Sequence, residues 1–157
     1  MGLIDIELFA TLDLVGQAPG GPEEDPVGFP FGGWQAPLLD EVAGAQVGAA
    51  YVGPDLAGAV REIRDRHRHV KVVGSLNLVQ TLLREKLFDR LDLWVHPVVL
   101  GVGKKVFDGG AVPTNVTLLE PPVAGPKGTV YLRYGLADGT PGTGDMSAPD
   151  RGAGRDD

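Results

Sequence analysis

The order of regular segments in the middle of the chain limits the fold more than any other feature. A short β-branched strand is predicted over residues 69–73 (HVKVV), a helix over 76–87 (LNLVQTLLREKL), and a strand that ends as an apolar run over 91–100 (LDLWVHPVVL). A further helix is predicted over 54–67, with its opening proline at a natural first-turn position. This strand–helix–strand order predicts an α/β fold.

Further strands are predicted toward both ends. Residues 3–9 (LIDIELF) alternate as a strand, and 114–120 and 129–136 are two strands separated by the turn-rich stretch PPVAGPKG. Consecutive strands at the end of an α/β chain indicate a mixed sheet. Residues 137–157 have no apolar period, so we expect a disordered tail behind a single domain of residues 1–136.

Composition excludes several classes of function. The 157 residues suit one domain, and the absence of cysteine excludes disulfides, thiolate zinc sites and cysteine nucleophiles. Acidic residues near the N-terminus do not suit a signal peptide, and no apolar run could span a membrane, so we expect a soluble, cytoplasmic protein. The net charge of −7 disfavours nucleic acid as a general partner.

A long irregular stretch follows the first predicted strand. Residues 16–37 contain five prolines and six glycines, which neither helix nor strand tolerates. The stretch also carries Phe29, Phe31 and Trp34, so we expect it to pack over the domain, as a lid on a binding site or as a surface flap. A short helix is predicted over 37–48.

Two glycine-containing stretches raise the question of phosphate binding. Gly101-Val102-Gly103-Lys104-Lys105 lacks the first glycine, the hydroxyl and the following helix of a Walker loop, which favours a corner at a strand end, although its two lysines could face an anion. In residues 72–80 (VVGSLNLVQ), Gly74 permits a sharp turn and Ser75 can cap the following helix. Such a helix start can bind an anion, or can be an ordinary capped helix packed on a sheet.

The remaining polar candidates are weaker. Residues 61–71 are rich in Arg and Lys and are interpreted as a solvated face rather than an anion site. His67 and His69 have no third ligand in register, so no metal site is expected. Asp13, beside the long loop, is either a site acid or a turn residue.

Three stretches in order carry a resemblance to a known family: TLDLVGQAPGGPEEDPVGFPFGGWQAP, VVGSLNLVQTLL and LDLWVHPVVLGVGKKVFDGG. Together they resemble the dihydrofolate-reductase-like fold, in particular the riboflavin-biosynthesis reductases that form the C-terminal domain of the bifunctional deaminase-reductase. The resemblance implies a mixed, mainly parallel sheet flanked by helices, with a C-terminal β-hairpin. It also implies NADPH-dependent reduction of a small heterocyclic or ribosylamino-pyrimidine substrate.

The resemblance also implies roles for particular residues. Gly74, Ser75, Leu76 and Asn77 would meet the cofactor pyrophosphate. Trp34 and Gln35 would border the substrate pocket, together with Asp13 as the candidate catalytic residue. His96-Pro97 and the corner at 101–105 would complete the sheet.

Three departures from the family pattern bear on activity. Leu14 and Leu76 each replace a usual glycine, and Leu76 would crowd a pyrophosphate. Between the Trp34 loop and Pro54 the family has further strand and helix that grip the nucleotide, whereas this chain runs almost straight on, so the fold is expected to be abbreviated in the middle. Two hypotheses follow: a reductase, or a non-catalytic remnant acting as a dimerisation or small-ligand-binding module. An incomplete sheet with an exposed edge predicts a homodimer.

Overall fold

A computed structural model describes residues 2–41, 56–108 and 112–144 of the chain. Within these residues, a six-stranded mixed sheet carries two α-helices, which confirms the α/β prediction. The elements in chain order are β1 (Leu3–Thr11), the short 3-10 helix η1 (Ala36–Leu38), α1 (Leu56–Arg66), β2 (His69–Val72), α2 (Leu76–Arg84), β3 (Arg90–His96), β4 (Val116–Leu118), β5 (Val123–Ala124) and β6 (Val130–Leu136).

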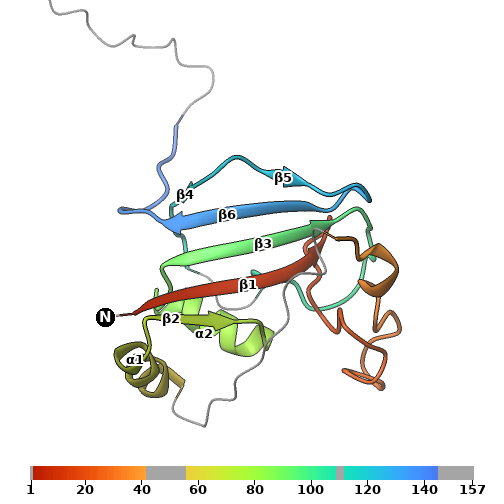
Figure 1. Ribbon diagram of the computed structural model, residues 1–157, viewed down its shortest axis with the longest axis horizontal. Coiled ribbons are helices and arrows are strands. Elements are labelled where there is room, and N and C mark those ends of the chain that lie inside the picture. Colours follow the sequence, from red (N-terminus) through yellow and green to blue (C-terminus); the bar gives the residue numbers. More distant parts are fainter. Residues whose placement is uncertain (1, 42–55, 109–111, 145–157) are drawn as a thin grey trace, which may run out of the picture.

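The strands lie in the order β2-β1-β3-β6-β4, and β5 also pairs with β6. In Figure 1, the arrowheads of β1 and β3 point to the same side, toward the loop of residues 16–41, whereas β6 points the opposite way. β1 is parallel to β2 and β3, and β6 is antiparallel to β3, β4 and β5. Two of these five strand pairs are parallel and three are antiparallel, so the described sheet is mixed, as predicted, but not mainly parallel. The reason is that the last three strands join by short turns rather than by helical crossovers.

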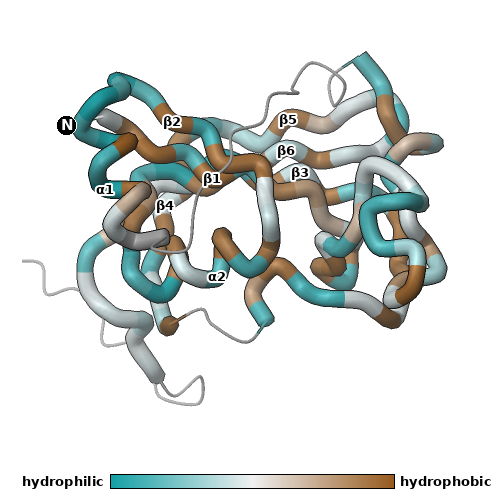
Figure 2. Tube along the Cα trace, turned by 90° about the horizontal axis from the view of Figure 1, so that it is seen from below, coloured by the Kyte–Doolittle hydropathy of each residue, from teal (hydrophilic) through white to brown (hydrophobic). Residues whose placement is uncertain are grey.

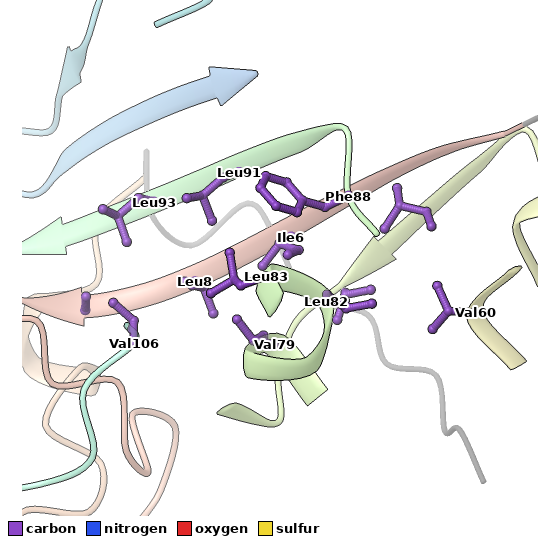
Figure 3. Close-up of a cluster of buried hydrophobic side chains, with 13 residues drawn as sticks. Ile6, Leu8, Val60, Val79, Leu82, Leu83, Phe88, Leu91, Leu93 and Val106 are labelled. Atoms are coloured by element: carbon purple, nitrogen blue, oxygen red, sulfur yellow. The ribbon is translucent and has the colours of Figure 1, made fainter. Parts of the chain in front are cut away.

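One face of the sheet forms the main hydrophobic core. Alternate residues of β1 point toward the helices, and both helices cover this one face (Figure 2). Val79, Leu82 and Leu83 of α2 are buried against it, as the helical spacing predicts. Figure 3 shows these side chains beneath β1 and β3, with Val60 contributed by α1.

The other face of the same strands is polar and yet buried. Asp5, Glu7 and Asp92 are only 1%, 2% and 1% exposed. Glu7 and Asp92 lie directly opposite each other on β1 and β3, an arrangement that is repulsive without nearby cations. Lys71 supplies one, with its ammonium 3.1 Å from Glu7, and Arg133 supplies the other.

Arg133 holds Asp92 in a bidentate pair. Its Nε and Nη2 donate to Oδ1 and Oδ2 of Asp92, each at 2.8 Å. The hydrogen bonds to Asp92 raise the pKa of Arg133 above its ordinary value. Asp5 is paired in turn with His69 at 2.5 Å and with Arg90 at 3.9 Å. The acids of this face are therefore held in a network of ion pairs.

Several predicted boundaries differ from the structure for local reasons. β3 ends at His96 because Pro97 has no N–H to continue the ladder. Helix α2 ends at Arg84, and Lys86 then adopts a left-handed φ of 51°. The two strands predicted over 114–120 and 129–136 pair antiparallel as β4 and β6, which forms the predicted C-terminal hairpin. β5 was not expected, since its two residues lie in the turn-rich stretch between them, where they also pair with β6.

Other expectations are corrected or fall outside the described residues. No α-helix begins at Pro37, where η1 ends at Leu38 and residues 39–41 are irregular, and 42–48 lie outside the description. Residues 54–55 of the second predicted helix also lie outside the described residues. So does most of the segment where the fold was expected to be abbreviated. Residues 137–144 contain no helix or strand, and 145–157 are not described.

Strands β2 and β4 form the two edges of the described sheet. The expected homodimer therefore stays a prediction. No helix among the described residues is both long and apolar enough to cross a bilayer.

Candidate functional site

A cleft of about 350 Å3 opens where β2 separates from β1. The pairing of these strands ends at Ile6 and Val72, while β1 continues to Thr11 beside β3. Beyond Ile6, the edge of β1 that faces β2 has no strand partner among the described residues. Glu7, Leu8 and Phe9 line the cleft there. The cleft lies at the carboxyl ends of parallel strands, the usual place for a ligand in an α/β sheet.

One wall of the cleft is the turn from β2 into α2, and it contains all four residues predicted to contact a cofactor: Gly74, Ser75, Leu76 and Asn77. Gly74 has a φ of 93° and is joined to Ser75 by a cis peptide bond. Ser75 caps α2 by accepting a hydrogen bond from Leu78 N at 3.5 Å, which confirms the predicted cap. The free N–H groups of the first turn and the helix dipole favour an anion beside this wall.

Leu76 is partly buried. Its side chain packs against the main core, close to Gly16, where an added Cβ would lie 3.2 Å from Leu76 Cδ2. Much of the Leu76 side chain, which was expected to crowd a pyrophosphate, is therefore packed against the core.

The facing wall is built by the start of the long loop and by the corner after β3. It contains Gly16–Pro19, Glu24, Asp25 and Lys104. Gln17 joins these pieces, because its Oε1 accepts from Lys104 N at 2.8 Å and its Nε2 donates to Asp25 at 2.6 Å. Its backbone carbonyl accepts from the indole of Trp34 at 2.9 Å.

The Gly-x-Gly-Lys-Lys stretch is a corner, as its departures from a Walker loop predict. Gly101 and Gly103 have φ values of 75° and 116°. The chain then pairs with the segment after β1, through Gly16 N to Lys104 O at 3.0 Å and Val106 N to Leu14 O at 2.9 Å. Of the two lysines, only Lys104 is among the residues that line the cleft.

Asp13 is not among the lining residues and acts as a tie between segments. Its carboxylate accepts hydrogen bonds from Thr11 Oγ1 at 2.6 Å, Gly101 N at 2.7 Å and Leu100 N at 3.2 Å. The Thr11 hydroxyl, aided by the two backbone N–H groups, lowers the pKa of Asp13 to about 2. Asp13 is thus ionised at neutral pH and ties the end of β1 to the corner after β3. Its role as the catalytic residue stays a prediction.

These contacts predict a pH-dependent contribution to stability. Because the folded pKa lies below the ordinary value of 3.8, the contribution is present above about pH 4 and is lost as the pH falls toward 2. Asp13→Asn should therefore lower the thermal midpoint at pH 7, and the difference from the unmodified chain should shrink between pH 4 and pH 2. A difference that stays constant across this range would show that the carboxylate charge is not involved.

Trp34 and Gln35, predicted to border a substrate, both lie against His96, and Trp34 belongs to a second buried hydrophobic cluster. They are 8% and 7% exposed, and Gln35 Nε2 lies 3.4 Å from His96 Nε2. His96 Nδ1 faces the carbonyls of Ala10 and Trp94 at 3.3 and 3.2 Å, so it carries the proton and Nε2 accepts from Gln35. Burial lowers the pKa of His96, which keeps the ring neutral. Neither Trp34 nor Gln35 lines the cleft, so their role as substrate contacts remains a prediction.

The long loop packs over the domain as predicted. Phe29 is 5% exposed and, together with Trp34 and Val15, belongs to this second cluster. Phe31 differs from the expectation, since it is 44% exposed and touches the edge of Phe29. The loop contributes to the cleft through Gln17 and the residues around it rather than through its aromatic side chains.

Sequence reasoning missed Glu7, Gln17 and Lys104 as cleft residues. Lys104 carried a usable signal, since it was already a candidate for facing an anion. Glu7 alternates with apolar residues, which is typical of a solvated strand face, so the sequence did not indicate that it lines a cleft.

In the basic stretch at 61–71, Arg66 pairs with Glu62 on the surface of α1, in keeping with a solvated face. Arg64 differs from this interpretation, since its side chain is only 18% exposed and donates to Asp89 Oδ1 at 2.7 Å. No group of metal-ligating side chains occurs in the described parts of the chain.

Comparison with known proteins identifies the family. The family model described as the RibD C-terminal domain matches residues 39–127, more than half of the chain. The chain belongs to the RibD C-terminal domain family. No curated protein matches the sequence.

Solved structures share the fold of this RibD-family chain at low sequence identity. A putative riboflavin biosynthesis protein from Shewanella sp. PV-4 is 13% identical with a TM-score of 0.57, over 88% of this chain and 100% of that one. The deaminase/5-amino-6-(5-phosphoribosylamino)uracil reductase of Thermotoga maritima is 12% identical with a TM-score of 0.55, over 87% and 57%. RibD of Acinetobacter baumannii is 13% identical with a TM-score of 0.51, over 88% and 59%. The chain thus spans less than three fifths of the last two proteins.

Proposed function

We propose that this chain is an NADPH-dependent reductase that acts on a small heterocyclic or ribosylamino-pyrimidine substrate, in the manner of 5-amino-6-(5-phosphoribosylamino)uracil reductases. One observation carries the proposal. In a chain of the RibD C-terminal domain family, Gly74, Ser75, Leu76 and Asn77 line a single cleft at the carboxyl ends of β1 and β2.

The residues of the cleft fit part of a dinucleotide. A volume of about 350 Å3 lies at the lower end of the range for small-molecule pockets, roughly 300–1,000 Å3. The start of α2 offers N–H donors, and Lys104 offers a cation on the facing wall. The two acids that the loop contributes to the lining are hydrogen-bonded within the loop itself. Glu24 accepts from Gly20 N, and Asp25 accepts from Gln17 Nε2 and Gly28 N.

Each part of the chain then has a definite task. The first turn of α2 and Lys104 hold phosphate between them, while Gln17 fixes the distance between the walls. The unpaired edge of β1 offers backbone groups to a planar ring. The cofactor supplies the hydride, so the chain has mainly to bind and orient two ligands.

An NADPH fluorescence titration on the purified chain, run beside NADH, tests the proposal. Saturable micromolar binding with a preference for NADPH is expected. Turnover should then be screened with pterins and ribosylamino-pyrimidines. A folded sample that binds neither nucleotide at millimolar concentration would refute the cofactor site.

The two adjacent lysines of the corner provide a matched pair of variants. Lys104→Ala should weaken NADPH binding about tenfold, because a charge-assisted hydrogen bond contributes about 1.5–3 kcal/mol. Lys105→Ala changes the neighbouring exposed lysine, which lies outside the cleft lining, and should leave the dissociation constant within about twofold. Equal effects of the two substitutions would mean that the corner contributes to NADPH binding only through its overall positive charge, not through a specific contact of Lys104.

A second candidate function rests on the contacts of Asp13. The residue predicted as the site acid is held ionised and lies outside the cleft lining. This favours a chain that binds a nucleotide or small ligand without turnover. NADPH binding without substrate-dependent oxidation across the substrate panel would select this candidate.

A further inference from the structure

Gln17 lines the cleft and joins three segments of the chain there. Its side-chain Oε1 accepts a hydrogen bond from Lys104 N at 2.8 Å, and its Nε2 donates to Asp25 Oδ2 at 2.6 Å. Its backbone carbonyl accepts from the indole Nε1 of Trp34 at 2.9 Å. The corner after β3 is therefore tied to two later points of the long loop through this one residue.

Lys104 has a fixed backbone and a side chain without a partner. Gly16 N donates to Lys104 O at 3.0 Å, and Gln17 Oε1 accepts from Lys104 N. The Lys104 side chain is exposed and lines the cleft, and no hydrogen bond or ion pair with another described residue engages its ammonium. The direction of this cation therefore depends on its backbone, which Gly16 and Gln17 hold.

Asp25 decides which way the Gln17 amide faces. A side-chain amide presents one acceptor oxygen and one N–H₂ group. The Asp25 carboxylate accepts from this N–H₂ group through Oδ2, and Gly28 N holds its Oδ1 at 2.9 Å. Turning the amide over would set its oxygen against the Asp25 carboxylate and its N–H₂ group against the Lys104 N–H. The acid thus keeps the Gln17 oxygen facing Lys104.

We propose that Gln17 is a positioning residue, which places the Lys104 ammonium for an anionic ligand in the cleft and makes this placement depend on the rest of the long loop. Asp25 orients the Gln17 amide from within the loop, and Trp34 holds the Gln17 carbonyl. Gln17 acts on the ligand through Lys104 and not by a contact of its own. The inference rests on the proposed function only in requiring that the cleft binds an anion near Lys104.

A double-mutant cycle between Gln17 and Lys104 tests this dependence, because the effects of coupled residues do not add. Isothermal titration calorimetry measures the dissociation constants of NADPH and of inorganic pyrophosphate, which carries the anion without the nucleosides. Gln17→Met keeps the length of the side chain and removes both of its hydrogen bonds. It should weaken binding about fivefold in the unmodified chain, and less than about twofold once Lys104→Ala is present.

Two further comparisons locate the coupling. In the Lys105→Ala background, Gln17→Met should again weaken binding about fivefold, because the neighbouring lysine lies outside the cleft lining. Trp34→Phe keeps an aromatic ring in the second buried cluster and removes the donor to the Gln17 carbonyl. It should weaken binding about threefold, and only while Lys104 is present.

Exchanging the acid and the amide separates positioning from loss of the side chain. The double variant Gln17→Glu with Asp25→Asn leaves the net charge unchanged and keeps both hydrogen bonds. The new amide donates to the new carboxylate, whose other oxygen accepts from Lys104 N. This exchanged pair should bind both anions within about twofold of the unmodified chain.

Two outcomes overturn the inference: additive effects of Gln17→Met and Lys104→Ala, or a folded exchanged pair that binds as weakly as Gln17→Met. If Gln17→Met loses its native circular dichroism spectrum, the cycle of Trp34→Phe with Lys104→Ala decides in the same way. Coupled effects on pyrophosphate in a chain that ignores NADPH would keep this inference and remove the proposed cofactor. NADPH binding with additive effects would do the opposite, and a folded chain that binds neither anion would overturn both.

Discussion

Arg133→Met is expected to lower the free energy of unfolding by about 3 kcal/mol. Asp92 is 1% exposed, and Arg133 makes both hydrogen bonds to its carboxylate. Removing one partner of a buried pair leaves an uncompensated charge, which costs about 3–5 kcal/mol, and the partial exposure of Arg133 places the value at the lower end. Glu7, directly opposite Asp92 on β1, adds repulsion that the arginine now offsets.

Urea unfolding of the purified variant measures the effect. Arg66→Met is the matched control, because Arg66 pairs with Glu62 on the surface of α1, where both side chains are more than 60% exposed. That change should cost less than about 1 kcal/mol. The double variant Asp92→Asn with Arg133→Met should recover part of the loss, since the buried charge is gone. Similar losses for Arg66→Met and Arg133→Met would contradict the ion-pair account.

Gly103→Ala should also destabilise the chain by about 3 kcal/mol or more. Its φ of 116° lies outside the region that L-residues adopt readily, which costs about 1–3 kcal/mol. An added Cβ would also lie 2.6 Å from Val15 Cγ1 and 2.7 Å from Phe29 Cε2. The corner would have to move away from the second buried cluster and take Lys104 with it, so NADPH affinity should fall as well.

Gly101→Ala is the control within the same turn. Gly101 has a φ of 75° and nothing within 4 Å of an added Cβ, so only the left-handed backbone is penalised, by about 1–2 kcal/mol. The two variants thus separate backbone strain from steric conflict by their urea midpoints. Equal losses would mean that the corner does not pack against Val15 and Phe29 as described.

The sequence was sufficient for features that depend on local periodicity. The inward face of α2, the cap at Ser75 and the strand over His69–Val72 follow from the spacing of apolar and capping residues, and the structure confirms them. The turn at Gly74 was found for the same reason, since a strand, a glycine and a capped helix are adjacent in the chain.

Features that depend on contacts distant in sequence could not be predicted. Alternation in LIDIELF indicates one apolar and one polar face, but not that Lys71, Arg90 and Arg133 arrive from other strands to bury the acids. The contacts of Asp13 with Leu100 and Gly101 could not be foreseen because these residues lie 87 and 88 positions away. The opposite wall of the cleft was missed because Gln17 reaches a backbone N–H 87 residues along the chain.

The position of β1 has a consequence for synthesis on the ribosome. β1, which has one apolar face, lies in the interior of the described sheet, and its two partners among the described strands begin at His69 and Arg90. A nascent chain therefore carries β1 unpaired until both partners have emerged, and contacts of such long separation form slowly. During that interval β1 is exposed and prone to aggregate. The yield of soluble protein should therefore depend on chaperones that shield β1 and on the rate of translation through residues 69–96.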